Sequence, residues 1–277
     1  MKGKGIALLV CIPFVVFYLL FQVAPLIWVV INGFQLEDGG WGLENFEEIL
    51  SSKFYLQSIQ FSLEISVWSS LLGLVIAFLG SYSLSALRPS KLGDFILSFN
   101  SMTSNFSGIP LAFAFIILLG VNGAVNIFLR QNGFDIIDIY GKEGVIIIYT
   151  YFQIPLAVLL LYPAFEVLQK EWQEAAELLG ASVLTYWRKV AIPVLMPALF
   201  GTLVILFANA IGAYSTVYAL SSGNFNIVPI RIGSLISGDL FLNPYMASAL
   251  AFMLVILMLL VTLVHRVVLS RYNYQGK

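Results

Sequence analysis

A run of charged and small residues between positions 171 and 195 interrupts an otherwise apolar chain. Glu174 and Glu177 are three residues apart, so their carboxylates lie on one side of a predicted helix. Exposed carboxylates can form ion pairs with an arginine or lysine of another protein, and the small side chains of Ala175 and Ala176 let a second helix come close. These residues therefore predict a protein-binding surface.

The same segment predicts a helix, a turn and a second helix. Gly180 is typical of a helix stop, and Ser182 or Thr185 can cap the helix that follows. Pro193 is expected to end this second helix. An alternative is an amphipathic hairpin at the membrane surface, with tryptophan and tyrosine at the level of the lipid headgroups.

Signatures of catalysis or nucleotide binding are not found in the sequence. No segment matches G-x-x-x-x-G-K-[ST], so the chain is not expected to bind ATP through a P-loop of its own. Neither G-x-S-x-G nor H-E-x-x-H occurs. The single histidine, His265, is expected near the end of the last apolar run, as an interfacial residue. No catalytic residue, metal site or cofactor of this chain is therefore predicted.

Three polar residues in apolar runs are candidates for a solute pathway. Ionisable groups inside membrane segments are rare and often functional. Glu64 could face a water-filled path, or it could reach the outer membrane interface. Asn209 and Tyr214 could line the path, or they could serve helix packing together with the small residues around them.

The elements that must position these residues are transmembrane helices. Of the 277 residues, 60% are hydrophobic and 10% are charged, which excludes a typical soluble domain. A transmembrane helix needs about 20 apolar residues. The first run is interpreted as a membrane helix rather than a cleaved signal peptide, because its apolar stretch continues to Phe34. We predict an all-α integral membrane protein with one domain, 1–277, and six spans at about 6–34, 58–87, 102–120, 145–168, 197–220 and 244–269.

The distribution of lysine and arginine predicts the orientation, because positively charged loops stay in the cytoplasm. With the N-terminus inside, ten of the fourteen basic residues fall on the cytoplasmic side. Both termini and the loop at 169–196 are then cytoplasmic. The outer loops are acidic, which either keeps them soluble or provides a docking site for an extracellular partner. The cytoplasmic set is Lys2, Lys4, Arg88, Lys91, Lys170, Arg188, Lys189, Arg266, Arg271 and Lys277, and the outer set is Lys53, Arg130, Lys142 and Arg231.

The spacing of the residues in this loop resembles a family motif. The run E-A-A, three residues, G, nine residues and V-A-I-P resembles the EAA loop of permease subunits in binding-protein-dependent type I ABC importers, which have the MetI-like fold. Members of that family usually read E-A-A, three residues, G, nine residues and I-x-L-P. The resemblance extends over most of the chain after Ser58. The matching residues are Glu174, Ala175, Ala176, Gly180, Pro193 and, as conservative replacements, Val190 and Ile192.

This resemblance implies an ATP-driven importer in which the chain forms half of the solute pathway. The loop at 169–196 would form coupling helices that dock into a cytoplasmic ATPase dimer, which holds the ATP and Mg. The other implied partners are a second permease subunit, expected to be a different chain, an extracytoplasmic solute-binding protein and membrane lipid. A multi-pass location in the cytoplasmic (inner) membrane of a prokaryote follows, and the net charge of −1 gives no reason to expect nucleic acid.

The run "FANAIGAYSTVYAL" looks most like permeases for polyamines, ferric iron, thiamine or organophosphonates. A small polar or charged solute such as a polyamine is therefore expected. One alternative is a standalone secondary transporter or channel that uses Glu64. Another is a membrane scaffold with an amphipathic cytoplasmic hairpin. The standalone transporter predicts activity without ATPase partners and a loop at 171–195 that tolerates mutation. The scaffold predicts lipid-dependent but nucleotide-independent behaviour.

Overall fold

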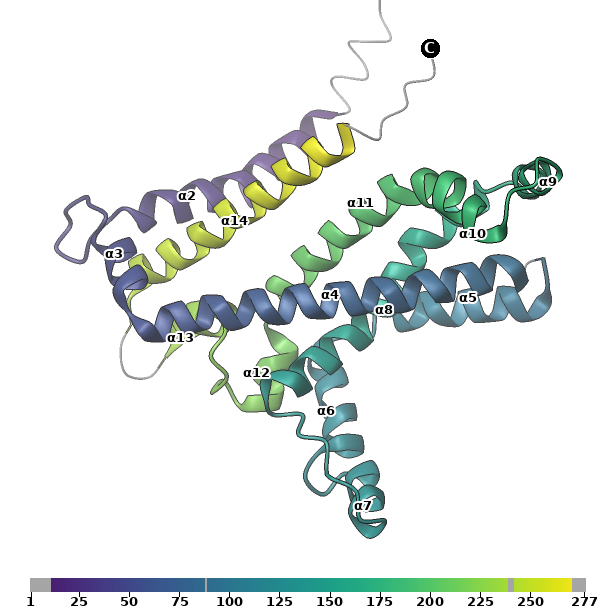
Figure 1. Ribbon diagram of the computed structural model, residues 1–277. Coiled ribbons are helices and arrows are strands. Elements are labelled where there is room, and N and C mark those ends of the chain that lie inside the picture. The colour runs from purple at the N-terminus through teal and green to yellow at the C-terminus, as the bar shows by residue number, and fades with distance from the viewer. Residues whose placement is uncertain (1–10, 88, 239–241, 271–277) are drawn as a thin grey trace, which may run out of the picture. The chain divides into compact units, whose positions relative to one another are not determined.

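The computed structural model describes residues 11–87, 89–238 and 242–270, and its regular elements within these ranges are helices (Figure 1). The chain divides into two compact units, one formed by residues up to 58 with 231–257 and the other by 59–230 with residues from 258 onward. Six helical segments are long and apolar enough to cross a membrane, so the predicted all-α membrane fold with six spans is confirmed. They are Cys11–Gly33, Lys53–Leu87, Gly108–Gln131, Lys142–Glu166, Val183–Ile211 and Pro244–Ser270.

The first unit pairs the start of the chain with the first half of α14 (Pro244–Ser270). The opening helix contains a π-helical turn, η1 (Leu19–Val23), and continues as α2 (Ala24–Gly33), after which α3 (Glu44–Ser51) follows a loop. A Cβ atom on Gly33 would lie 3.3 Å from the Cα of Ala249, so glycine permits close helix contact here. The Asn45 amide donates to the carbonyl oxygens of Gly33 and Gln35, at 3.2 and 2.9 Å.

The second unit is built on α4 (Lys53–Leu87) and α8 (Lys142–Glu166). Small residues let membrane helices approach closely, and α4 presents a row of them toward α8. A Cβ atom on Gly73 would lie 3.2 Å from the Cβ of Gln153, and the Gln153 amide donates to the Ser69 hydroxyl at 3.0 Å. The buried small residues of α4 in this unit are Ser62, Ser66, Ser69, Ser70, Gly73, Ala77 and Ser81.

The region of the third predicted span, 102–120, differs from the prediction. Residues 91–103 form a separate helix, α5 (Lys91–Thr103), which the sequence did not predict, and the chain breaks before α6 (Gly108–Leu119) and the short α7 (Ala124–Gln131). Asn100 of α5 donates to the carbonyl oxygen of Pro155 at 3.0 Å and so joins α5 to α8. Serine and asparagine around position 105 favour local hydrogen bonds over a continuous helix.

The helix at the fifth predicted span, 197–220, also has different bounds in the structure. Residues 183–211 form one continuous helical segment: α10 (Val183–Tyr186), the π-helical turn η2 (Trp187–Ala191) and α11 (Ile192–Ile211). Pro193 therefore does not end a helix. It follows directly on the π-helical turn η2, so its missing backbone N–H falls where the regular α-helical hydrogen-bond pattern is already interrupted. The helix ends at Ile211, and a short α12 (Ser215–Ser221) follows.

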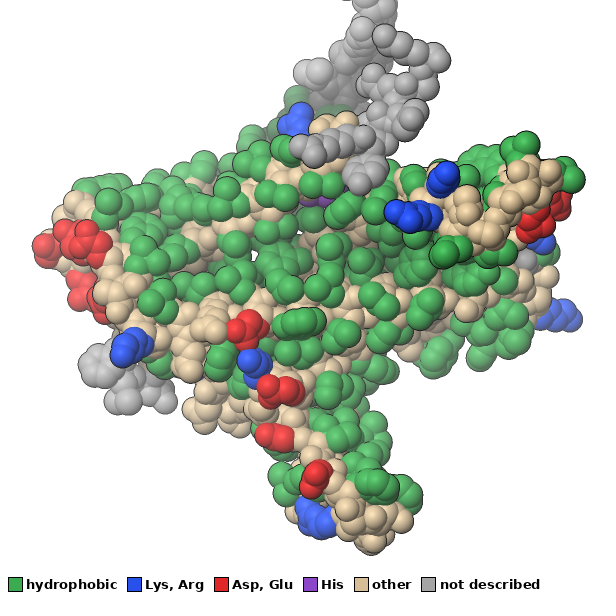
Figure 2. Space-filling view, in the orientation of Figure 1, with side chains coloured by type: hydrophobic (Ala, Val, Ile, Leu, Met, Phe, Trp, Pro, Cys, Tyr) green, Lys and Arg blue, Asp and Glu red, His purple; other side chains and the backbone are tan. Residues whose placement is uncertain are grey.

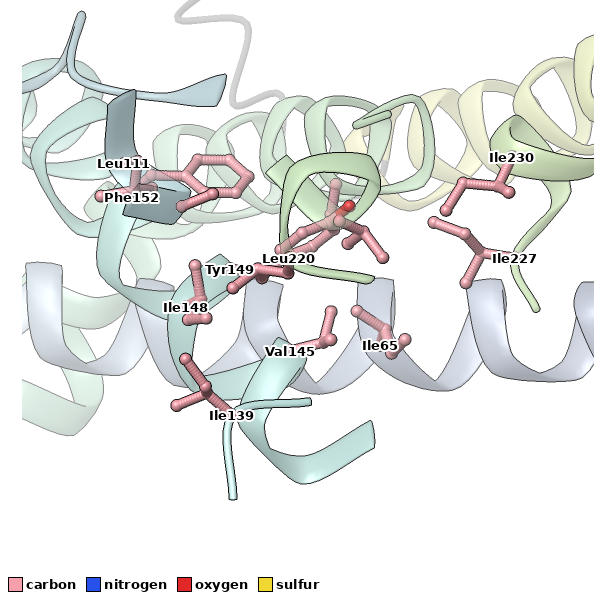
Figure 3. Packing of buried hydrophobic residues seen from close by; sticks show 13 residues of the cluster. Ile65, Leu111, Ile139, Val145, Ile148, Tyr149, Phe152, Leu220, Ile227 and Ile230 are labelled. Atoms are coloured by element: carbon pink, nitrogen blue, oxygen red, sulfur yellow. The ribbon is translucent and has the colours of Figure 1, made fainter. Parts of the chain in front are cut away.

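Buried hydrophobic side chains join these elements into a core in the second unit (Figure 3). Tyr149 and Phe152 of α8 meet Leu111 of α6 and Leu220 of α12, and Ile65 of α4 closes the cluster. Ile227 and Ile230, at the start of α13 (Val228–Ser237), also belong to it. The core therefore fixes α6 and α12 against α8.

Hydrophobic side chains dominate the molecular surface over α4, whereas charged side chains gather over α9 (Lys170–Leu178) and η2 (Figure 2). This distribution suits helices that face lipid along their length and water at their ends. The cytoplasmic placement of both termini stays a prediction. Five of the basic residues on which this prediction was based lie outside the described residues, namely Lys2, Lys4, Arg88, Arg271 and Lys277.

Candidate functional site

The motif residues of the predicted coupling loop lie on α9, a helix that packs little against the rest of the chain. Every residue of α9 except Ala176 is exposed, including Glu174, Ala175 and Glu177. The Gln173 amide donates to a Glu177 carboxylate oxygen at 3.0 Å, which is the only side-chain hydrogen bond found for Glu174 or Glu177 within the described residues. Both carboxylates are therefore accessible to a partner.

Gly180 ends α9 through a Schellman motif, in which the N–H groups after the helix bond back to its last carbonyl groups. The Gly180 N–H donates to the Glu177 carbonyl, and the Ala181 N–H to the Ala176 carbonyl, both at 2.9 Å. Gly180 has φ +77°, in the left-handed region that favours glycine. The constant spacing from E-A-A to G thus has a local physical cause: the glycine must follow the helix at this distance to close it.

The turn exposes leucine side chains in a region that the sequence places outside the membrane. Leu178 and Leu179 are 90% and 88% exposed. The next helix begins at Val183, capped by the Ser182 hydroxyl, which accepts from the Thr185 N–H at 3.2 Å. The prediction that Ser182 or Thr185 caps this helix is confirmed for Ser182. The turn therefore presents an apolar tip held by two well-formed helix ends.

The remaining motif residues lie where the second helix passes into the fifth span. Val190 and Ile192 are half-buried and Pro193 is exposed. The Ile192 N–H donates to the Trp187 carbonyl in the π-helical turn η2. Trp187 packs edge-on against Phe78 and Tyr82 of α4. The second half of the motif is thus anchored in the helical framework, unlike the first half.

Glu64 lies in an ion pair between the start of α8 and α4. Its carboxylate accepts from Lys142 Nζ at 2.7 Å and from the Gln60 amide at 2.7 Å. The Glu64 and Lys142 side chains are each about a third exposed, at 32% and 33%. This geometry ties α4 to α8, and Glu64 is not among the residues that line the polar pocket described next. In the described ranges, no group of three or more His, Cys, Asp or Glu side chains is placed to hold a metal ion.

Asn209 and Tyr214, the other two predicted pathway residues, line one polar pocket of about 550 Å³. Asn209 comes from α11, and Tyr214 follows the end of that helix. The pocket also contains hydroxyl groups from the break before α6 and from the first two residues of α12, which the sequence interpretation did not include among the site residues. These are Ser104, Ser107, Ser215 and Thr216. The run "NSMTSNFSGIP" was interpreted only as a delayed helix start, although its serines were the available signal.

The pocket keeps its shape through contacts between α6, α8 and α12. The Tyr149 hydroxyl of α8 donates to the Ala213 carbonyl at 2.7 Å and fixes the turn before α12. Gly108 has φ +72°, and a Cβ there would lie 3.0 Å from Ser215 Oγ, so the starts of α6 and α12 touch. Partial burial, followed by the charge interaction with Tyr218, raises the pKa of the Tyr214 phenol. Tyr214 therefore stays a neutral hydrogen-bond donor near neutral pH.

The chain is similar to a known protein family and to individual transport proteins. Residues 69–274 match the family described as "Binding-protein-dependent transport system inner membrane component". The chain is 26% identical over 209 residues to a probable sulfate transport system permease protein of Chlorella vulgaris, covering 76% of each chain. It is 27% identical over 233 residues to a thiamine transport system permease protein of Brucella abortus, covering 83% of this chain and 42% of that protein.

Solved structures show the same fold. A chain of the bacterial alginate ABC transporter, in complex with a periplasmic protein bound to an alginate pentasaccharide, aligns with a TM-score of 0.79 at 17% identity. That alignment covers 100% of this chain and 98% of the other. A chain of the inward-facing MetNI methionine ABC transporter aligns with a TM-score of 0.60 at 19% identity, covering 79% of this chain and 95% of the other.

Proposed function

The chain belongs to the family of binding-protein-dependent transport system inner membrane components, and on this premise we propose that α9 and the Gly180 turn couple it to a cytoplasmic ATPase. As a member of the family, it is a permease subunit of a binding-protein-dependent ABC importer, and its task is transport rather than catalysis. What remains to be assigned is which surfaces carry out the coupling and the transport.

The observation that carries this proposal is the exposed apolar tip of the coupling segment. Leu178 and Leu179 are almost fully exposed, beside the accessible carboxylates of Glu174 and Glu177. Large exposed apolar side chains beside polar ones are typical of protein interaction sites. The low packing of α9 against its own chain fits a helix whose main contacts are made with a partner. The ATPase would hold ATP and Mg and supply the energy.

The pathway itself is proposed to include the polar pocket with Asn209 and Tyr214. A pocket open on one side and lined by polar groups is unfavourable toward lipid, so a second permease subunit is the natural cover. The acidic outer residues, such as those of α3, would receive the solute-binding protein. The alginate transporter was solved in complex with its periplasmic protein, which supports a partner of this kind. A prokaryotic inner membrane is the matching location.

Similarity to known relatives does not identify the solute that this chain transports. Their names mention sulfate and thiamine, which differ in charge, and none of those reported above mentions a polyamine. A polyamine also fits the pocket poorly, because a cation binds best beside carboxylates, and none lines the pocket among the described residues. A polyamine, which the sequence led us to expect, is therefore not supported as the solute.

The test is co-purification of the ATPase with the tagged chain, expressed with its partner subunits in mild detergent. Leu179→Glu places a carboxylate on the apolar tip, and Leu43→Glu places one on a leucine of the first outer loop that is 56% exposed. We expect Leu179→Glu to lose the ATPase at least about tenfold, since burying one leucine contributes about 1.5–3 kcal/mol. Leu43→Glu should retain it. Equal recovery of the ATPase with both variants would refute the proposal.

A further inference from the structure

We infer that Trp187 and the π-helical turn η2 set the direction of the ATPase-binding segment and transmit its movement to the polar pocket. Trp187 is in this sense a positioning residue, because it acts through α4 and α11 and not by contact with a solute. This role rests on the proposed function, since it says how α9 and the Gly180 turn are joined to the rest of the chain. It is supported by the geometry of η2, the ring contacts of Trp187, a cavity beside it and the course of α11.

The π-helical turn changes the rotation of the helix between its two sides. Its hydrogen bond from the Ile192 N–H to the Trp187 carbonyl spans five residues instead of four. The buried residues Tyr186 and Ala191 are also five positions apart, whereas an α-helix returns to the same face after three or four. η2 therefore keeps Tyr186 on the buried face that α11 continues. On α11, that face contains Leu195, Thr202, Leu206 and Ala210.

Trp187, the first residue of η2, joins this turn to α4. Its ring centroid lies 5.2 Å from that of Tyr82 and 6.1 Å from that of Phe78, both in edge-to-face arrangements. Aromatic pairs favour this geometry. Trp187 and Phe78 also pack against the buried cluster that contains Leu161 and Phe165 of α8. A displacement of η2 must therefore move these helices or break the ring contacts.

A cavity of about 610 Å³ separates α9 from the ends of α4 and α8. Side chains of all three helices line it, and so does Trp187. The chain holds α9 at its two ends, through residues 167–169 to α8 and through α10 to η2. A partner that binds α9 can therefore move it without first breaking a packed core. The lining residues from α9 and α4 are Lys170, Gln173, Tyr82 and Ser85.

α11 connects η2 to the polar pocket. α10, η2 and α11 form one continuous helical segment, Val183–Ile211. Asn209, near the end of this segment, and Gly212, directly after it, line the polar pocket. At 1.5 Å per residue, about 33 Å of helix lies between Trp187 and Asn209. Because packed, continuous helices carry displacements over such distances, a shift at η2 reaches the pocket.

Pro193, the last residue of the motif, accompanies the π-helical turn for a local reason. Proline has no N–H, so it cannot donate to the carbonyl four residues before it, that of Lys189. The first span has the same arrangement, with Pro25 after η1. In both cases the π-helical turn ends two residues before the proline, at Val23 and at Ala191. η1 therefore provides a matched control for changes in η2.

The first experiment follows the polar pocket with a thiol label. In a Cys11→Ser background, Ser107→Cys places the only thiol of this chain at the pocket. Labelling of the chain by a water-soluble maleimide is measured in the purified importer, without nucleotide and after ATP and vanadate have trapped the ATPase. We expect trapping to change the labelling rate severalfold. Trp187→Ala should abolish most of this change while the ATPase still co-purifies, and Trp187→Phe should preserve it.

Trp68→Ala is the control for the loss of a tryptophan. Trp68 also lies on a membrane-spanning helix, α4, but it is 56% exposed and does not line the cavity. It should leave the labelling change intact. Equal loss of the change with Trp68→Ala and Trp187→Ala would overturn the inference. A Trp187→Ala variant that responds to trapping as the parent does would overturn it too.

The second experiment removes the extra residue of η2. Deletion of Lys189, which is exposed, should convert the turn to a regular α-helix and rotate α10 by about 100° relative to α11. We expect most of the ATPase to be lost at nearly unchanged thermal stability. Deletion of Leu20 makes the same change in η1 and should leave ATPase recovery unchanged. Full ATPase recovery after deletion of Lys189 would overturn the inference, and if that deletion lowers stability, the labelling of Trp187→Ala decides.

The outcomes separate this inference from the proposed function. If Leu179→Glu loses the ATPase but Trp187→Ala leaves the labelling change intact, α9 binds the ATPase and transmission through Trp187 is wrong. Transmission is also wrong if trapping changes nothing in the parent although the ATPase is bound. If Leu179→Glu keeps the ATPase while Trp187→Ala abolishes the labelling change, the proposed binding site on α9 is wrong and the role of Trp187 remains.

Discussion

The α9 arm, which consists of α9 and the turn at Gly180, differs from the polar pocket in how the chain holds its functional residues. In the α9 arm, the motif side chains are exposed, and the helix is fixed by its own end at Gly180. In the pocket, residues from α6, α8, α11, α12 and the loops between them are brought together by a buried core and by the hydrogen bond from Tyr149 to Ala213. One region depends on local geometry and the other on packing.

This difference implies that mutations in the two regions should have different effects on stability and on function. A helix with few contacts to its own chain contributes little to global stability, so changes there should affect partner binding alone. A site built by packing loses stability and function together. Stability in detergent and ATPase recovery are therefore separate readouts, and a variant in either region that lowers both would contradict this difference.

The largest loss of stability is expected at Asn126, which supports the packed region. Asn126 is fully buried and donates to the carbonyl groups of Leu119, Gly120 and Ile137, while it accepts from the Ile137 N–H. Asn126→Ala leaves these groups unpaired and should cost at least about 2 kcal/mol. Thermal unfolding in detergent measures this. Asn132→Ala, which removes an exposed bond to Phe128, is the control and should cost less than about 0.5 kcal/mol.

Gly180→Val tests the local geometry of the α9 arm. A β-branched residue in the left-handed region costs about 1–2 kcal/mol, so the closed turn becomes rarer and ATPase recovery should fall roughly tenfold. Global stability should hardly change.

Gly133→Val provides the matched control for this substitution. Gly133 has φ +76°, and it too has open space around its Cβ position, so the strain is the same at a different place. It should leave ATPase recovery unchanged. A loss of ATPase with Gly133→Val equal to that with Gly180→Val would remove the special role of the α9 turn.

Tyr149→Phe tests the bond that fixes the pocket turn. Loss of the 2.7 Å hydrogen bond to the Ala213 carbonyl should cost about 1 kcal/mol of stability. Solute uptake should fall with it, while ATPase recovery stays at the wild-type value. Tyr151→Phe is the control, because Tyr151 is 41% exposed, and it should change neither quantity. Loss of the ATPase with Tyr149→Phe would show that the two regions are not separate.

Glu64→Gln is expected to have the smallest effect. Partly exposed ion pairs contribute little, so ATP-driven uptake should stay within about twofold of wild type. Lys142→Gln should behave in the same way, since it removes the other half of the pair. The alternative of a standalone transporter that uses Glu64 predicts instead that Glu64→Gln abolishes uptake while ATPase partners are dispensable. Transport assays with and without the ATPase distinguish the two accounts.

The α9 arm could be predicted from the sequence because its determinants are local. The exposed carboxylates, the helix stop at Gly180 and the cap at Ser182 are all encoded within a few residues of the structure they form. The same local reasoning was wrong at Pro193, which lies inside a continuous helical segment directly after the π-helical turn η2. The sequence around Pro193 did not indicate this turn.

The polar pocket could not be predicted in full, because it joins residues that are far apart in the chain. Asn209 and Tyr214 were found as polar residues in an apolar run, but nothing near Ser107 or Ser215 indicates that they meet. Their meeting depends on the close approach at Gly108 and on the core around Tyr149 and Phe152. Such contacts follow from the packing of the whole unit rather than from any local pattern.

Site-specific cross-linking tests the central claim most directly. Cys11 is the only cysteine, so a Cys11→Ser background with Glu174→Cys or Asn132→Cys carries one thiol at a chosen position. A bifunctional thiol- and amine-reactive reagent is added to the importer, which is purified with its partner subunits. We predict that Glu174→Cys, and not Asn132→Cys, gives a product containing the ATPase. An importer that hydrolyses ATP but gives no such product from position 174 would contradict the coupling role of α9.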